Sequence, residues 1–278
     1  PASMMFFARD YTTVVEATRS EIAAAAELFI GERSYAKATL RGGSLAAEAV
    51  YIGYESTGEG WLVLEQDGSN TPTVAIGDSS IPMLIGCSGV GTLTQNAGTV
   101  TRRDQDGPYP GVILAYDAEG TGRYELNDGS LHADSLTVGR SGAGTFVQSG
   151  GLALVDHDLH IGVNSQSSGV VSLLGGSTTV ENVLCGSGDS ELNVDGGDLK
   201  LNGTSIEVEA LNVGKSHGSF GRLELTGKTV TAEEMTVGGD GDGTYVARSG
   251  VTDIASQLRV GDIHAGRVKQ DGGTVTVG

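Results

Sequence analysis

Residues 136–152 read LTVGRSGAGTFVQSGGL, and this stretch decides the fold. It contains an apolar-x-apolar-Gly phrase, a Gly-rich turn, and a run in which apolar and polar residues alternate. Alternation with a period of two is typical of a short strand with one buried face. Glycine supplies the positive φ that a sharp corner requires. The stretch therefore predicts short strands separated by glycine corners.

The apolar-x-apolar-Gly phrase recurs along the chain. From Gly139 onward its glycine returns after 23, 24, 28, 24, 23 and 17 residues. Each interval also holds a Gly-rich turn and a Gly-Gly or Asp-Gly turn, and an alternating run follows each of them. Three strands and three corners in ~23 residues make one coil of a parallel β-helix. We therefore predict an all-β solenoid of about 11 coils of ~23–24 residues, with no obvious end caps.

Two coils are longer than the others. The extra residues fall at about 71–80 and 102–111, and we expect both stretches to be loops inserted at one corner. No linker interrupts the repeat. Residues 1–278 are therefore predicted to form a single β-helix domain.

The N-terminal segment gives two conflicting signals. Residues 15–30 are rich in alanine and glutamate, which favour a helix. However, Ala8 lies 23 residues before Gly31, and residues 5–8 stand where the repeat phrase belongs. The spacing predicts strands, and a capping helix within 1–30 is the alternative.

Composition limits the partners. Hydrophobic residues make up 38% of the chain, enough for a core, while the net charge is −18. Such a charge repels nucleic acid and anionic lipid, and no run of 18 apolar residues exists. We expect neither a nucleic-acid partner nor membrane insertion. Of the two cysteines, Cys87 and Cys185, Cys185 occupies an apolar repeat position and is expected to be a buried free thiol.

The repeat resembles the β-strand repeats of bacterial autotransporter passengers and related large surface proteins. Residues 136–152 match most clearly, the resemblance extends from about residue 83 onward, and residues 5–82 share only the spacing. It implies a right-handed parallel β-helix on the extracellular bacterial cell surface. Because those repeats are scaffold, it implies no catalytic or cofactor-binding residue, and we predict that the chain is not an enzyme.

Charged residues gather at one predicted corner in three consecutive coils. Stacked coils would bring them within ~10 Å, where they could bind a metal or act as acid and base on a polysaccharide. Asp, His and Arg are also ordinary residents of exposed turns, and we favour that interpretation. The residues are Arg102, Arg103, Asp104, Asp106, His132, Asp134, Asp156, His157 and Asp158.

A second metal candidate is the glycine-aspartate stretch 238–243, GGDGDG, with Asp240 and Asp242. It is similar to the Ca²⁺-binding turns of β-rolls, where such a motif repeats back to back. Here it occurs once, so an ordinary acidic corner is favoured. The remaining histidines, His160, His217 and His264, are isolated in the sequence, and we assign them no role.

The outward position of the phrase forms a row along the predicted helix. Its first members are apolar, and a contiguous apolar row on a wet face needs cover. Either the two inserted loops cover it, or it makes a lateral contact with another copy through Phe6, Phe29, Tyr51 and Leu84. The full predicted row is Phe6, Phe29, Tyr51, Leu84, Ile113, Thr137, His160, Leu184, Asn212, Thr236, Arg259 and Thr276.

The two ends of the repeat are in phase. Residues 5–8 and residues 275–278 occupy the same position of the repeat, and uncapped coils leave strand edges unpaired. Such ends are complementary and favour head-to-tail self-association. We therefore expect the structural subunit of an extracellular β-helical filament. The alternatives are a scaffold segment of a longer adhesin and a polysaccharide-binding or polysaccharide-cleaving β-helix.

Overall fold

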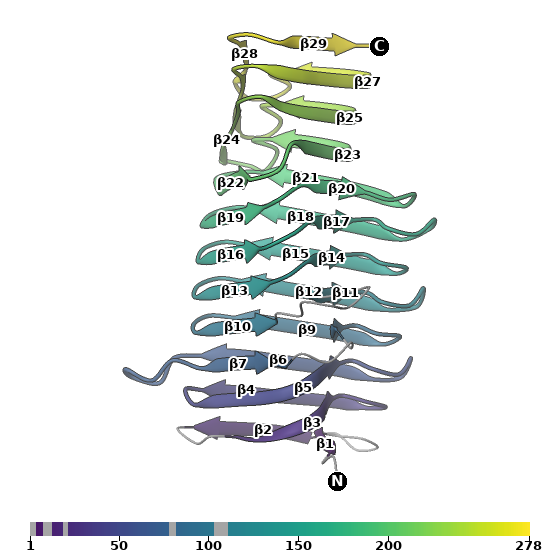
Figure 1. Ribbon diagram of the computed structural model, residues 1–278, viewed down its shortest axis with the longest axis vertical. Helices are drawn as coiled ribbons and strands as arrows, with labels where there is room; N and C mark the ends of the chain where they lie inside the picture. The colour runs from purple at the N-terminus through teal and green to yellow at the C-terminus, as the bar shows by residue number, and fades with distance from the viewer. Residues whose placement is uncertain (1–3, 8–12, 19–21, 78–81, 103–110) are drawn as a thin grey trace.

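The computed structural model describes residues 4–7, 13–18, 22–77, 82–102 and 111–278, with side chains from Ala26 onward. The chain is a parallel β-solenoid of about ten turns, and its coils stack along one long axis (Figure 1). The described residues contain no helix. This confirms the predicted fold class.

The lower coils place their strands in three rows. The first row holds β1 (Met4–Phe7), the second halves of β3 (Ile22–Ile30) and β5 (Ser44–Ile52), β8 (Met83–Ile85), β11 (Val112–Leu114), β14 (Leu136–Val138), β17 (Leu159–Ile161) and β20 (Val183–Cys185). The second row holds β2 (Thr13–Thr18), β4 (Tyr35–Arg41), β6 (Glu59–Glu65), β9 (Val90–Gln95), β12 (Thr121–Leu126), β15 (Ala143–Gln148), β18 (Ser168–Leu173) and β21 (Asp189–Val194). The third row holds the first halves of β3 and β5, then β7 (Thr73–Ile76), β10 (Thr99–Arg102), β13 (Ser130–Ala133), β16 (Leu152–Val155), β19 (Ser177–Val180) and β22 (Asp198–Leu201).

The glycine of the repeat phrase makes the corner between the first and second rows. Gly139 has φ +74°, and a Cβ there would lie 2.1 Å from the Ser168 carbonyl oxygen of the next coil. Positive φ and close stacking both exclude a larger side chain. The Gly139 amide itself donates to the Leu114 carbonyl of the coil below, at 3.0 Å. Glycine therefore recurs at this corner in most coils, because the corners of neighbouring coils stack closely and leave little room for a side chain.

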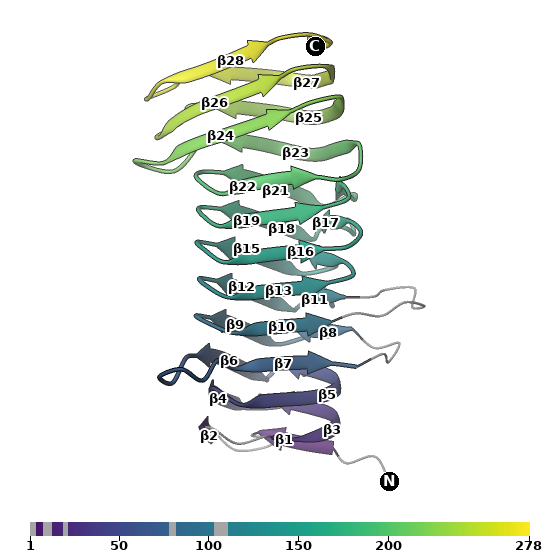
Figure 2. The same cartoon turned by 60° about the vertical axis from the view of Figure 1, so that its left-hand side comes forward.

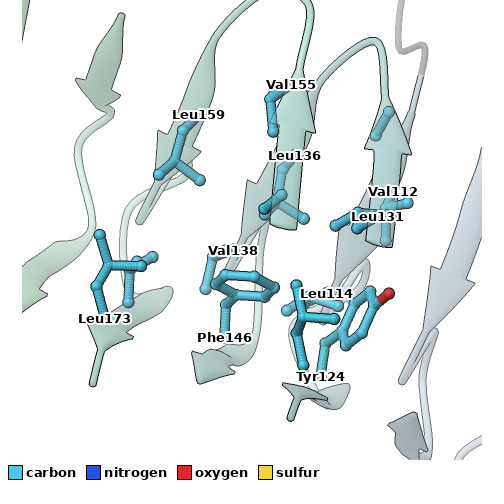
Figure 3. Packing of buried hydrophobic residues seen from close by; sticks show 14 of the residues in the cluster. Val112, Leu114, Tyr124, Leu131, Leu136, Val138, Phe146, Val155, Leu159 and Leu173 are labelled. Carbon is cyan, nitrogen blue, oxygen red and sulfur yellow. The ribbon is translucent and has the colours of Figure 1, made fainter. Parts of the chain in front are cut away.

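Inward-facing side chains of successive coils form one continuous core. Figure 3 shows this packing, with the rings of Tyr124 and Phe146 edge to face at 5.5 Å. The predicted inward residues of β14, β17 and β23 are at most 1% exposed, namely Leu136, Val138, Leu159, Ile161, Leu211 and Val213. The buried Tyr124 hydroxyl donates to Gln95 Oε1 at 2.5 Å, so this core polar group is satisfied.

An extra strand shifts the repeat by one row above β20. The first half of β23 (Ser205–Val213) pairs with β20 through Ile206, and its second half pairs with β21 from Ala210 to Val213. The phrase at 211–214 therefore lies on the second row, whereas every earlier copy lies on the first. The 28-residue interval holds one additional short strand segment, at 205–208, and this segment causes the shift.

The upper coils keep this shifted order. The first halves of β25 (Lys228–Val237) and β27 (Gly250–Val260), followed by β29 (Thr274–Val277), continue the first row. The second halves of β25 and β27 continue the second row. On the remaining side β24 (Phe220–Leu225), β26 (Asp242–Ala247) and β28 (Gly266–Gln270) form a separate parallel sheet above β22 (Figure 2).

The N-terminal segment forms strands, as its spacing predicts. β1, β2 and β3 pair in parallel with the next coil, and the capping helix is not formed in the described residues. The predicted insert at 71–80 is partly wrong, because residues 73–76 are the coil strand β7. A turn closed by Asp67 and Asn70 precedes that strand, and residues 78–81 lie outside the described part. Of the second insert, residues 103–110 also lie outside it.

Candidate functional site

The charged corner after the third row stacks through its backbone. The Asp134 amide donates to Arg102 O at 3.2 Å, and the His157 amide donates to Asp134 O at 2.7 Å. Three consecutive coils therefore meet there, as predicted. Arg102 is buried and donates from Nη1 to Gly77 O at 2.9 Å, which makes it a structural residue. The Asp158 carboxylate accepts a bond from Asn182 Nδ2 at 2.9 Å.

The side chains of this corner support a shared metal or catalytic site less than the stacking of its backbone does. Asp156 and His157 are exposed, and Arg103, Asp104 and Asp106 lie outside the described residues. Among the described side chains, the group of three metal-ligating residues lies elsewhere in the chain. That these residues are ordinary members of turns stays a prediction, and a role of Asp134, Asp156, His157 or Asp158 on a polysaccharide or a metal stays the untested alternative.

That three-residue group lies on corners of the upper coils. His217 follows β23, Asp240 follows β25 and His264 follows β27, and their candidate ligand atoms all lie within 4.8 Å of one another. His217 Nδ1 is 3.3 Å from Asp240 Oδ2, and His264 Nε2 is 3.9 Å from Asp240 Oδ1. Sequence reasoning missed both histidines. The sequence did hold a signal for them. His217 lies 23 residues before Asp240 and His264 lies 24 residues after it, which is one coil length in each direction.

A buried carboxylate holds the lowest of these corners in place. Asp195 is 4% exposed and accepts the Lys215 amide at 2.6 Å and the Ser216 hydroxyl at 2.5 Å. The Ser216 amide and the Ser219 hydroxyl complete its shell at 3.3 and 3.4 Å. A buried carboxylate is stable only when it is bonded in this way. The turn that carries His217 is therefore fixed from beneath.

The two thiols lie in different environments, because Cys87 is buried and Cys185 is not. Cys185 is exposed, because β23 pairs with β20 only at Val183 and then crosses to β21. The prediction of a buried Cys185 is therefore wrong. Cys87 is 6% exposed, and burial, with the nearby Asp117 carboxylate, raises the pKa of its thiol to about 11.

The same crossing of β23 opens a groove on the surface. Cys185, the turn 186–190, Glu207, Glu209 and Glu233 are among its lining residues, and it encloses about 610 Å³. The Glu209 amide donates to Ser190 Oγ at 2.8 Å, which ties the two sides together. The groove is acidic, open and built around the extra strand, so we interpret it as a result of the row shift.

The apolar row is buried within the chain. Phe29, Tyr51, Leu84 and Ile113 are between 2% and 7% exposed, although they point away from the main core. Phe29 stacks on Tyr51 with ring centroids 4.6 Å apart, and burial raises the pKa of Tyr51. The burial of this apolar row favours the explanation that other parts of the same chain cover it, over a lateral contact with another copy. Phe6 pairs with Phe29 through its backbone, and its side chain lies outside the described part.

The predicted row also divides at the extra strand. Thr137, His160 and Leu184 continue it on β14, β17 and β20. Asn212 instead lies beside Asn193 of β21, and its Nδ2 donates to Asn193 Oδ1 at 2.9 Å. The assignment of one continuous outward row is therefore wrong for Asn212, Thr236 and Arg259, which lie on the second row, whereas Thr276 of β29 lies on the first row.

In the last coil, side chains are exposed at positions whose equivalents one coil below are buried. Val237 is fully buried, whereas Val260, its partner in register, is 45% exposed. Ile254 is fully buried, whereas its partner Val277 is 46% exposed. We call this surface the C-terminal edge, made of Leu258, Val260, Val268, Val275 and Val277.

Comparison with protein-family models, with curated proteins and with solved structures gives no match. No helix of the described residues is long and apolar enough to cross a membrane.

Proposed function

We propose that this chain is a structural protein, the subunit of an extracellular β-helical filament that grows by stacking coils head to tail. The observation that carries the proposal is the C-terminal edge. Its five apolar side chains point in the core direction, and no other coil of the described residues covers them. An edge that combines apolar side chains with unpaired strands favours association with another strand-bearing surface.

The other end of the solenoid offers a matching surface. Among the described strands, β1 pairs only with β3 and β2 pairs only with β4. Both strands therefore have one side that no other described strand occupies, and all strand pairs of the three rows run parallel. A second copy placed with the same polarity continues the parallel pairing. This contact is heterologous and does not close, so it produces a fibre.

Two alternative roles predict a different behaviour of the purified chain. As a scaffold segment of a longer adhesin, for which the similarity to autotransporter passenger repeats is the argument, the same edge would receive further coils of its own chain. A polysaccharide-binding role would instead use the corner of Asp134 and His157. Neither alternative requires the pure chain to polymerise.

The test uses neighbouring residues of β29. Val277 faces the core direction and Thr276 faces outward, so Val277→Asp and Thr276→Asp add the same charge one residue apart. We expect fibres in electron micrographs of the wild-type chain and of Thr276→Asp. Val277→Asp should fold and remain monomeric in size-exclusion chromatography, because Val277 is already half exposed. A wild-type chain that stays monomeric at high concentration, or fibres in Val277→Asp, would contradict the filament.

A further inference from the structure

We propose that His217, Asp240 and His264 bind one divalent transition-metal ion of the Zn²⁺ class on the corners of three successive upper coils. Two imidazoles and one carboxylate form a frequent ligand set for Zn²⁺, with the remaining position left to water. All candidate ligand atoms lie within 4.8 Å of one another. This site uses different residues from the C-terminal edge, so it stands independently of the filament.

The distances fit such an ion after small side-chain rotations. Ligand atoms about 2.1 Å from a tetrahedral Zn²⁺ lie roughly 3.4 Å from each other. His217 Nδ1 and Asp240 Oδ2 are 3.3 Å apart, which already matches. His264 Nε2 is 3.9 Å from the other oxygen of that carboxylate, Asp240 Oδ1, and must approach for both rings to face one ion. Its side chain is 44% exposed and the His217 side chain is 83% exposed, so both can rotate.

The choice of metal follows from the nitrogen ligands. Ca²⁺ and Mg²⁺ prefer oxygen ligands, which the two aspartates alone would supply. Imidazole favours Zn²⁺, Ni²⁺ and Cu²⁺. Sequence reasoning suggested Ca²⁺ for Asp240 and Asp242, but the coil stacking adds His217 and His264 and changes the preference.

Asp242 supplies an outer contact that metal-binding histidines commonly have. Its Oδ1 lies 3.9 Å from His264 Nδ1, on the opposite ring nitrogen from the one that faces Asp240. It also accepts the Ala265 amide at 3.1 Å, which fixes its position. If the rotation of His264 brings these two atoms within hydrogen-bond distance, the carboxylate would orient the imidazole and strengthen its bond to the metal.

The backbone holds the three corners in register before any ion arrives. The Gly218 amide donates to Asp240 O at 3.2 Å, and the His264 amide donates to Gly239 O at 3.1 Å. Asp195 supports the lowest corner. A preformed site of this kind costs little ordering when it binds an ion. The competing explanation is an exposed His–Asp ion pair, which binds no metal and contributes little to stability.

The experiment is isothermal titration calorimetry of the purified chain with ZnCl₂, and with CaCl₂ in a parallel titration. We expect one Zn²⁺ per chain and no comparable binding of Ca²⁺. His217→Gln and His264→Gln should each weaken Zn²⁺ binding more than tenfold, and Asp242→Asn should weaken it by about tenfold. The matched control is His160→Gln, which removes a histidine on β17 that has no assigned role and should bind normally.

Thermal unfolding provides a second measurement. Zn²⁺ should raise the Tm of the wild-type chain and of the control, because it binds the folded state. The Tm of His217→Gln/His264→Gln should not respond, while its circular dichroism should match the wild type. Absence of saturable Zn²⁺ binding, or one-to-one binding that survives in His217→Gln/His264→Gln, overturns the proposal.

Discussion

Cys87 and Cys185 differ at the residue scale because their coils are covered differently. Cys87 packs in the buried cluster that contains Leu84 and Ile113, 3.8 Å from the Asp117 carboxylate, and its thiol pKa rises from 9.0 to about 11. The folded chain thus holds the thiol proton more tightly than the unfolded chain does. Its contribution to stability is present below pH 9 and is lost as the pH rises from about 9 to about 11.

We predict that only Cys185 reacts with iodoacetamide in the folded chain at pH 7.5. The nucleophile is the thiolate, and burial keeps the Cys87 thiol protonated and covered. Mass spectrometry after proteolysis identifies the labelled peptide. Urea-unfolded chain, in which both cysteines should react, is the control. Equal labelling of both cysteines in the folded chain would show that the coil around Cys87 opens.

Two glycines with similar φ test why corners need glycine. Gly139 has φ +74° and no room for a Cβ, whereas Gly68 has φ +61° and nothing within 4 Å of an added Cβ. Gly68→Ala should cost about 1 kcal/mol, for backbone strain alone. Gly139→Ala should cost clearly more, because its Cβ would also displace the next coil. Urea denaturation measures both, and equal costs would mean that stacking adds no constraint.

At the scale of the strand, spacing predicted most elements because each coil repeats the same short strands and glycine corners. The phrase at 136–139, the corners and the inward residues all follow from period-two alternation and glycine. The extra segment at 205–208 was not predicted. The 28-residue interval exceeds the usual length by about five residues, and these could form either a longer turn or a short strand. Only the pairing of β23 with β20 and β21 shows that they form a strand.

The candidate site was less predictable for the same reason. Asp240 stood out within a glycine-aspartate stretch, but His217 and His264 gain meaning only when coils are stacked in register. The outer strand β27 shows another limit. Leu258 and Val260 carry the inward pattern, yet they are partly exposed, because burial depends on a neighbouring coil that the pattern does not include.

We predict that the side chains of neighbouring strands β23 and β25 respond differently to an added charge. Val213→Asp places a carboxylate where the wild-type side chain is fully buried, and should cost several kcal/mol. Thr236→Asp, on the outward face of β25, should change the unfolding free energy by less than about 1 kcal/mol. Chemical denaturation followed by circular dichroism measures both. Equal losses would show that the inward and outward assignment is wrong.

At the scale of the whole molecule, the solenoid has two dissimilar surfaces, its acidic sides and its ends. The net charge of −18 keeps the sides of neighbouring rods apart. The C-terminal edge is apolar, so its association does not depend on charge attraction. Growth along the axis is therefore favoured over side-by-side bundling, which agrees with the proposed unbranched filament.

The extra strand segment determines the symmetry that such a fibre would have. The first row runs without a break from β1 to β29, so the first and last described strands lie on the same one of three faces. If the chain path continues strand after strand into the next copy, β1 of that copy must occupy the following face. Each copy is then related to its neighbour by a screw operation of about a third of a turn. We predict an axial repeat of three subunits in helical reconstructions, and a pure translation between copies would contradict it.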